Sequence, residues 1–400
     1  TAVDILSHYQ ALSEIEDICR GRKPSKRHKR ENNEHVIVET KFVPQRALSH
    51  SKFHKSIDLI ACVDATPLEA NGSIYVGCQG GVILMFTPDG DIKSFWILHG
   101  WMIQADVLCI NDSIVACAHS LSGKGLVISL SSDLEHENWR KEFNFPIKST
   151  PVLDIEELWI VSEKSVVILN SLTGTMQGVK AQLPYRCLSK PLLCATNNEK
   201  RLVCASSDWE GGLMIVDSFG NVSCFLENDN IGPVYTELCM LDNNSRRRIL
   251  ISDSHGAVHY VELETMRVVS TIRLSSGYHP LSPPLLLDDQ RIVVGSHNGK
   301  VICFAGSGEV LWECDCGTAI KSRPLMIMAA ADAPNDNSII IACTTGGHIF
   351  RINSSKHEMI EWRYRINAEI WSNPVSINGG KHICFGARDS RIHILDAFND

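Results

Sequence analysis

The sequence predicts an all-β fold, an eight-bladed β-propeller, with seven blades as the alternative count. Residues 280–316 form a unit of four short apolar runs separated by turn residues. Similar units recur roughly every 40–50 residues along the chain, which is the period of a four-stranded propeller blade. The pattern is also out of phase at its two ends, as expected if strands from the N- and C-terminal parts close one blade together.

The unit at 280–316 shows the elements most clearly. Its apolar runs, 285–287, 292–294, 301–304 and 310–312, have the length and β-branched content of strands. We expect Asn298-Gly299 to supply two positive-φ residues to a tight hairpin turn between the second and third runs. One such sheet cannot bury both of its faces alone, so it needs neighbours of the same kind.

The copies share a start signal of an aliphatic residue, a small residue and usually a proline, which we assign to the first strand of each blade. Clear copies begin at Val63, Ile147, Leu188, Leu281, Ile320 and Ile370, and degenerate ones begin near Ile103 and Ile231. The predicted blades are 62–101, 102–145, 146–185, 186–229, 230–278, 279–318, 319–368 and 369–400 with the early strand. The fifth blade is the least regular, and a miscount there would leave seven.

Turn and aromatic residues recur at fixed places in these blades. Hairpin turns are expected at Gly80-Gly81, Gly123, Gly211-Gly212, Gly256, Asn298-Gly299 and Gly346-Gly347. Turns before the fourth strand are expected at Gly90, Gly174, Gly220 and Gly308. The equivalent fourth-strand tryptophans, which we expect to pack between blades, are Trp96, Trp139, Trp312 and Trp362.

The two ends of the repeat region complement each other. Residues 53–60 resemble a fourth strand but precede any first strand, whereas 390–396 is a third strand that no fourth strand follows. We therefore expect these segments to pair, because closure removes the open sheet edges that invite aggregation. Before them, residues 1–19 have the spacing of a helical tail of a preceding domain, and 20–50 reads as a basic, flexible linker before a propeller at 51–400.

Composition limits the function classes. No apolar run reaches the roughly 18 residues that a membrane-spanning helix needs, so we expect no membrane association. The net charge is −8 although residues 20–30 hold seven Lys or Arg and no acid, so the remainder is acidic and nucleic acid is not expected as a partner. The basic run is either a solvated linker or a nuclear-localisation signal.

The 15 cysteines lie mostly within apolar runs, which favours a reducing, cytoplasmic location. Secretion is the competing interpretation, because the chain also carries five Asn-x-Ser sequons. They begin at Asn71, Asn111, Asn221, Asn243 and Asn353. A chain rich in Asn, Ser and Gly turns contains such matches by chance.

The repeat at 281–312, with its Ser-Pro start, Ile-Val-Val-Gly-Ser, Gly-x-Val and Gly-x-x-x-Trp segments, resembles quinoprotein (PQQ-like) propellers over about 53–400. Within that superfamily, the stretch Ile-Ala-Cys-Val-Asp-Ala-Thr-Pro-Leu from Ile60 resembles the start of the C-terminal propeller of β-alanine-activating enzymes. Those acyl-activating enzymes are related to aminoadipate-semialdehyde dehydrogenase. In them an adenylate-forming domain and a phosphopantetheine carrier domain precede the propeller.

This resemblance implies that residues 1–19 end the carrier-like domain, and that ATP, Mg²⁺ and phosphopantetheine belong to the parent chain. The 400 residues hold neither the carrier's attachment motif nor a phosphate-binding loop of an adenylating domain. For this piece we expect no cofactor and a non-catalytic interaction module, whose partner is the parent's carrier or adenylation domain or another protein. The alternatives are a stand-alone propeller scaffold and a PQQ-dependent dehydrogenase.

No catalytic, cofactor-binding or metal-binding residue is predicted. The catalytic quinoproteins use a vicinal disulfide, which this sequence lacks, and Cys314 and Cys316 are expected at the blade rim. His255 and His259 are expected on one strand face, without the further ligands that zinc requires. Neither Asp253-Ser254-His255 nor the hairpin at Gly295 has the arrangement of a catalytic site.

Three irregular insertions are the candidate binding loops, because propellers bind partners through loops at the channel mouth. They lie at 207–212, 243–248 and 329–337. The alternative is that they are surface loops without a function.

Overall fold

The computed structural model describes residues 48–51, 54–196, 199–209, 212–225, 231–243, 246–274, 280–287, 291–328, 338–353 and 360–398. The expected helical tail at 1–19, nearly all of the linker at 20–50 and the insertion at 329–337 lie outside them. The sheets belong to one compact unit, Ala47–Asp400. Among the described residues, none forms a helix with the length and hydropathy to cross a membrane.

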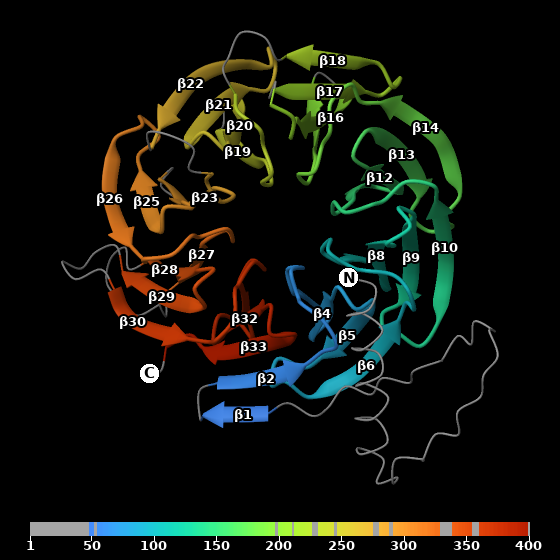
Figure 1. Cartoon of the computed structure of the whole chain (residues 1–400). Coiled ribbons are helices and arrows are strands. Elements are labelled where there is room, and N and C mark those ends of the chain that lie inside the picture. Colours follow the sequence, from blue (N-terminus) through green and yellow to red (C-terminus); the bar gives the residue numbers. More distant parts are fainter. Residues whose placement is uncertain are drawn as a thin grey trace, which may run out of the picture. The chain divides into compact units, whose positions relative to one another are not determined.

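Eight antiparallel sheets surround a common axis, as Figure 1 shows. Blade 1 contains β3 (Leu68–Ala70), β4 (Ser73–Gly77), β5 (Val82–Phe86) and β6 (Ile92–Ile97). Blade 2 contains β7 (Leu108–Ile110), β8 (Ser113–His119), β9 (Gly125–Ser131) and β10 (Glu137–Phe143). Blade 3 contains β11 (Val152–Asp154), β12 (Glu157–Val161), β13 (Ser165–Asn170) and β14 (Met176–Gln182). Blade 4 contains β15 (Leu192–Thr196), β16 (Glu199–Ala205), β17 (Leu213–Asp217) and β18 (Val222–Phe225).

The second half of the ring repeats this order. Blade 5 contains β19 (Cys239–Asn243), β20 (Arg246–Ser252), β21 (Ala257–Glu262) and β22 (Arg267–Arg273). Blade 6 contains β23 (Leu285–Leu286), β24 (Ile292–Gly295), β25 (Lys300–Phe304) and β26 (Val310–Asp315). Blade 7 contains β27 (Leu325–Met328), β28 (Ser338–Cys343), β29 (His348–Asn353) and β30 (Ile360–Arg365). Blade 8 contains β31 (Val375–Ile377), β32 (His382–Gly386) and β33 (Arg391–Asp396), with β1 (Leu48–Ser51) and β2 (His54–Asp58).

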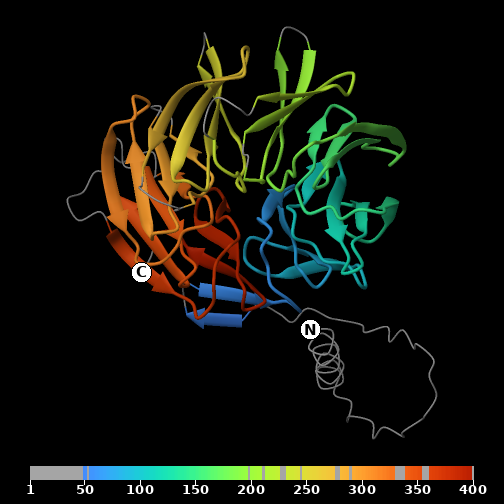
Figure 2. The same ribbon diagram turned by 45° about the horizontal axis from the view of Figure 1, so that its top comes forward.

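The ring closes as the sequence predicts. Strand β2 pairs antiparallel with β33 from His54 opposite Leu395 to Asp58 opposite Arg391. Blade 8 has one strand more than expected, because β1 pairs with the outer edge of β2. Figures 1 and 2 both place β1 and β2 on the outside of β33. The eight-blade count is confirmed, and the seven-blade alternative is excluded.

The hydrophobic core lies between neighbouring blades. Trp312 of β26 belongs to one buried cluster with Ile340 and Ile352 of blade 7, and Trp139 of β10 belongs to another with Ile160 and Leu169 of blade 3. Trp96 likewise lies against the cluster between blades 1 and 2. The expected inter-blade packing is therefore confirmed for these three tryptophans, whereas the side chain of Trp362 lies outside the description.

Two sequence assignments need correction. The proline-containing start signal is the connection between blades, and the first strand begins directly after it, because proline lacks the N–H that a strand ladder uses. Leu68, Val152 and Leu325, for example, begin their strands immediately after a proline. In the turn before β25 only Gly299 has a positive φ, +89°. Its N–H donates to the carbonyl of Ser296, so this is a longer turn in which Asn298 needs no left-handed backbone.

Candidate binding face

In the residues that the structure describes, the connections between blades and the turns between the second and third strands of a blade lie on one face of the ring. Successive strands of each blade are antiparallel, so these two kinds of loop emerge on the same side. We call this side the connection face. Three groups of side chains lie on it: the Trp371 stack, the Trp209 patch and the axial ring.

The Trp371 stack consists of Lys321, Trp371 and Arg388. Lys321 Nζ lies 3.4 Å and the Arg388 guanidinium carbon 3.3 Å from the centroid of the indole ring. Two cations at these distances cannot share one side of the ring, so the indole lies between them. Cation–π contacts of this kind contribute about 0.5–2 kcal/mol each, depending on how far they are removed from water.

Acidic groups hold the stack in place. Asp64 of the connection before blade 1 accepts two hydrogen bonds from Arg388, at 3.2 Å from Nε and 2.9 Å from Nη2. The indole N–H of Trp371 donates to Glu369 at 2.7 Å. Burial lowers the pKa of Lys321, an effect that Glu369 opposes and Arg388 adds to. The stack thus joins blades 7, 8 and 1 through half-buried charges.

The Trp209 patch consists of Arg186, Trp209, Tyr235 and His255, from blades 4 and 5 and the connections that precede them. Trp209 is 74% exposed and Tyr235 is 51% exposed. The Trp209 and His255 rings lie 6.2 Å apart between centroids. Because exposed aromatic and arginine side chains dominate the energetics of many interfaces, this is the part of the face most suited to binding a protein.

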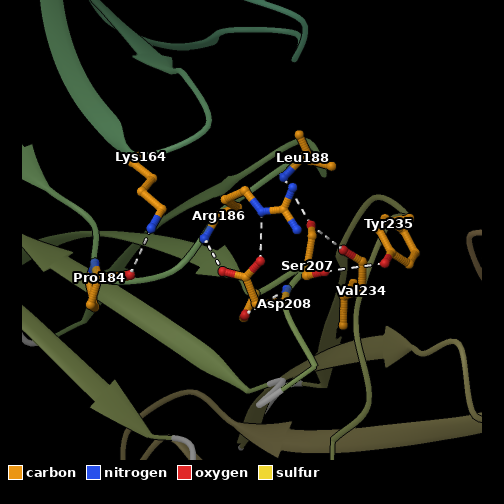
Figure 3. A network of polar contacts seen from close by, with 9 residues as sticks. Lys164, Pro184, Arg186, Leu188, Ser207, Asp208, Val234 and Tyr235 are labelled. Atoms are coloured by element: carbon orange, nitrogen blue, oxygen red, sulfur yellow. Dashed lines mark hydrogen bonds and ion pairs between the residues drawn. The ribbon is translucent and has the colours of Figure 1, made fainter.

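Figure 3 shows the polar contacts that fix this patch. Arg186 donates to Asp208 twice, from its backbone N–H at 2.9 Å and from Nε at 2.6 Å. The Tyr235 hydroxyl donates to the Ser207 carbonyl at 3.2 Å, and the Ser207 hydroxyl donates to the Val234 carbonyl at 2.8 Å. The backbone N–H of Arg186, with its guanidinium, lowers the pKa of Asp208. The loop before Trp209 is therefore bonded to both neighbouring connections.

The axial ring consists of the side chains two residues before the first strand of each blade. Its members are Thr66, Asp106, Thr150, Lys190, Glu237, Pro283, Arg323 and Asn373. The first strands that Figure 1 labels, β19, β23 and β27, are the innermost of their blades, and the first strands of several neighbouring blades contact each other. One residue from each blade thus lies close to the axis at the connection face.

Hydrogen bonds link much of this ring. Asp106 accepts the backbone N–H of Thr66 at 2.7 Å, and Thr150 accepts that of Asp106 at 3.0 Å. Asn373 accepts the backbone N–H of Arg323 at 2.8 Å and donates to Thr66 at 3.2 Å. Each of these bonds joins neighbouring blades.

The ring also carries opposed charges. Arg323 and Glu237 approach to 3.6 Å, with 42% and 22% of their side chains exposed. Burial raises the pKa of Asp106, the Glu237 carboxylate raises it further, and the Thr66 N–H and Lys190 oppose the shift. The axial ring therefore contains two carboxylates, Asp106 and Glu237, and two cationic side chains, Lys190 and Arg323.

The cysteines and histidines that the sequence offered as candidates lie in three different places. Cys314 and Cys316 are buried beside Trp312 at the outer strand of blade 6, which confirms the expected rim position. His259 is buried, with Nε2 3.0 Å from Asp253 Oδ2 and Nδ1 3.0 Å from Thr271. His255 lies in the turn before β21, so the prediction that it shares a strand face with His259 is wrong.

Two of the predicted binding loops lie on different faces of the ring. The segment 207–212, described except for 210–211, supplies Trp209 to the connection face as a binding loop would. The segment 243–248 ends β19 and begins β20, on the opposite face. In the described part of the chain, no three His, Cys, Asp or Glu side chains gather as a metal site would require.

The opposite face also exposes apolar side chains. Ile155 is 82% exposed and Leu172 is 53% exposed, both in turns of blade 3, and Phe219 is 83% exposed in a turn of blade 4. They are therefore the natural comparison in any test of which face binds.

No protein-family model matches the chain, and no curated protein does. Among solved structures, BamB from Moraxella catarrhalis is similar with a TM-score of 0.65 and 17% identity, covering 88% of this chain and 100% of that chain. The computationally designed Ika8 protein is similar with a TM-score of 0.63 and 13% identity, covering 84% of this chain and 96% of its own. At such identities the likeness concerns the fold alone, a β-propeller.

Proposed function

We propose that this propeller is a non-catalytic binding module of a multidomain ATP-dependent enzyme that activates acyl groups or amino acids and loads them on a phosphopantetheine carrier. The sequence resemblance from Ile60 to the β-alanine-activating enzymes supports the choice of parent. The observation that carries the binding role is the exposed Trp209 patch on the connection face, held by the contacts of Arg186 and Ser207.

In this proposal the adenylating chemistry, with its ATP, Mg²⁺ and phosphopantetheine, belongs to other domains of the parent. The propeller binds the carrier or adenylation domain through the connection face. Trp209 and Tyr235 supply the large apolar area, and Arg186 supplies a cation for an acidic partner. We place the protein in the reducing cytoplasm, an assignment that the 14 free cysteines of the described residues support.

The experiment uses the full 400-residue chain and the separately expressed upstream region of its reading frame. Biolayer interferometry measures their association, and the Trp209→Ala variant is compared with Phe219→Ala, which removes an equally exposed aromatic from the opposite face. We expect Trp209→Ala to weaken binding about tenfold or more, and Phe219→Ala to leave it unchanged. An equal loss in both, or a loss only in Phe219→Ala, would place the interface elsewhere.

The same reagents test the division of labour. The 400-residue chain is assayed for ATP–pyrophosphate exchange with β-alanine, and no exchange is expected from it. Exchange by the upstream region alone would support the proposed parent. A reading frame without an adenylating region would instead favour the stand-alone scaffold.

A further inference from the structure

The turn between β11 and β12 of blade 3 holds a strained residue. Ile155 is the first residue of this two-residue turn, and its backbone has a φ of +55°. Blades 1 and 2 have asparagine at the same place, Asn71 and Asn111, each with a φ of +51°. Asparagine tolerates this left-handed conformation, whereas a β-branched residue in it costs about 1–2 kcal/mol. The Ile155 side chain is 82% exposed, so packing within the chain does not offset the cost, and a role outside the fold would explain it.

Ile155 belongs to a row of exposed apolar side chains on the face opposite the connection face. The turn that carries Leu172 lies beside it, because the backbone N–H of Ser171 donates to the Glu156 carbonyl at 2.7 Å. The turn that carries Phe219 comes next, since its glycine packs against the main chain of β14 in blade 3. We call Ile155, Leu172 and Phe219 the apolar row.

The blade 3 end of the apolar row is acidic. Three carboxylates, Asp154, Glu156 and Glu157, lie in this turn and beside it. Lys200 of β16 pairs with Asp154 and, at 3.4 Å, with Glu157. Glu156 is exposed and accepts a hydrogen bond from the neutral Asn170 at 3.5 Å. Three carboxylates and one ammonium group leave this end with a net negative charge.

Blade 5, on the other side of blade 4, carries the opposite charge at the equivalent turn (Figure 1). Strand β20 begins there with three consecutive arginines, residues 246–248. Asp242 lies opposite Arg247 in the sheet, and Glu262 lies opposite Arg248, so the arginines remain in excess. The surface thus has an acidic end, an apolar middle and a basic end.

We infer that this surface binds a second copy of the chain in a twofold dimer. A twofold axis that lies in the interface, along the radius through blade 4, brings the Phe219 side chains of the two copies together. The same rotation places blade 3 of each copy over blade 5 of the other and inner turns over inner turns. Glu156 of one copy then faces Arg247 of the other, twice in the dimer, which is the charge complementarity that selects this partner. The Trp209 patch lies on the other face, so each copy keeps it open for docking.

Sedimentation velocity of the full chain tests the inference. We expect a particle of twice the chain's mass at micromolar concentrations, which dissociates on dilution. Phe219→Glu places two like charges at the axis and is expected to weaken the dimer about tenfold or more. Trp209→Ala, on the connection face, is the control and is expected to dimerise like the unaltered chain. A monomer at every concentration would overturn the inference, and so would an unweakened Phe219→Glu dimer.

Ile155→Asn separates a role in the dimer from a role in the fold. Asparagine relieves the backbone strain, so the thermal midpoint is expected to rise at dilutions where the chain is monomeric. The lost apolar contact is expected to weaken the dimer at the same time. A lower midpoint would show that Ile155 supports the fold, and an unchanged dimer would show that it lies outside the interface. Either result would contradict the inference.

A mixing experiment tests the facing of the two charged turns. Glu156→Lys and Arg247→Glu each create two repulsive pairs in their own dimer, so each is expected to be monomeric where the unaltered chain is dimeric. An equal mixture of the two variants has only attractive pairs and is expected to form the dimer again. Two folded variants that stay monomeric when mixed would overturn the proposed arrangement. If thermal unfolding shows that Arg247→Glu does not fold, Phe219→Glu and Ile155→Asn, at exposed turn positions, decide the question.

Discussion

At Gly81 the backbone has a φ of +78°, and a Cβ atom there would lie 2.3 Å from the carbonyl oxygen of Leu98. At Gly123 the φ is +79°, yet a Cβ atom would meet nothing within 4 Å. The two positions therefore separate the cost of backbone strain from the cost of a steric clash. Both are glycines that the sequence predicted as hairpin turns.

We predict that Gly123→Ala destabilises the fold by about 1 kcal/mol, the cost of an alanine with a left-handed backbone. Gly81→Ala adds a clash with main-chain atoms of a neighbouring turn, so its cost is expected to exceed about 2 kcal/mol. Urea unfolding followed by tryptophan fluorescence measures both. Equal midpoints for the two variants would show that the space behind Gly81 does not matter.

Asp106 gives a prediction about pH. Burial and Glu237 raise the pKa of this carboxyl above its ordinary value of 3.8, so the folded chain binds a proton there more readily than the unfolded chain. Ionisation of Asp106 therefore costs stability as pH rises through 3.8 toward the raised folded value, and the cost stays above that window. A function for the charge would explain why the fold tolerates this cost.

We expect Asp106→Asn to raise the thermal midpoint at pH 7, because asparagine still accepts the Thr66 N–H without the cost of a buried charge. The gain should shrink as pH falls toward 3.8, where the native carboxyl is increasingly protonated. Differential scanning calorimetry at pH 4, 5.5 and 7 measures it. Glu135→Gln, at an exposed turn of blade 2, is the control. A gain that grows on acidification would contradict the interpretation.

At the scale of elements, the pairing of β2 with β33 is accompanied by a chain of polar side chains, of which His54 and His393 are buried. His54 lies 2.6 Å from the Tyr364 hydroxyl through Nδ1 and 2.9 Å from His393 Nδ1 through Nε2. His393 Nε2 lies 3.1 Å from Asp389. If each hydroxyl or N–H donates to the next group, from Tyr364 toward Asp389, all three bonds are satisfied.

We predict that His54→Ala destabilises the chain by about 2–4 kcal/mol. The substitution removes the hydrogen-bond partner of both Tyr364 and His393, and it leaves a cavity where the buried imidazole was. His382→Ala, at the half-buried first position of β32 in the same sheet, should cost under about 1 kcal/mol. Urea unfolding of both variants measures the difference. Similar costs would mean that the chain of bonds adds little to closure.

The elements were largely predictable because their signals are local. Strand runs such as 292–294 and glycine turns such as Gly308 depend on neighbours in sequence, and the structure has both. Strand β1 was missed because its pairing depends on β2 rather than on any pattern of its own. The connections were misassigned to strands because their aliphatic residues, such as Ile320, are buried although they pair with no neighbouring strand.

The candidate site could not be predicted in the same way. Thr66 and Asn373 are 307 residues apart and become neighbours only when the ring closes. Trp371 lies between Lys321 and Arg388, which come from a different connection and a different turn. The recurring start signal did mark these positions, since each ring member precedes its strand by two residues. Recognising that the signal is a connection would have revealed the ring.

At the scale of the whole propeller, closure depends on strands from both parts of the chain. Removing residues 1–58 would delete β1 and β2 and leave β33 as an open edge with the buried Ile392 and Ile394 uncovered on one side. We predict that this truncated chain aggregates and has a lower thermal midpoint. Dynamic light scattering and scanning calorimetry measure both. A monomeric chain with an unchanged midpoint would show that closure by β2 is dispensable.

The connection face is the proposed functional side of the ring. Hydrogen–deuterium exchange of the full chain, with and without the adenylating and carrier region that we propose as its partner, tests this most directly. We predict slower exchange at 185–190, 207–209 and 232–238, which surround the Trp209 patch, and no change at 172–174 and 218–221 on the opposite face. Protection confined to those opposite turns would contradict the account.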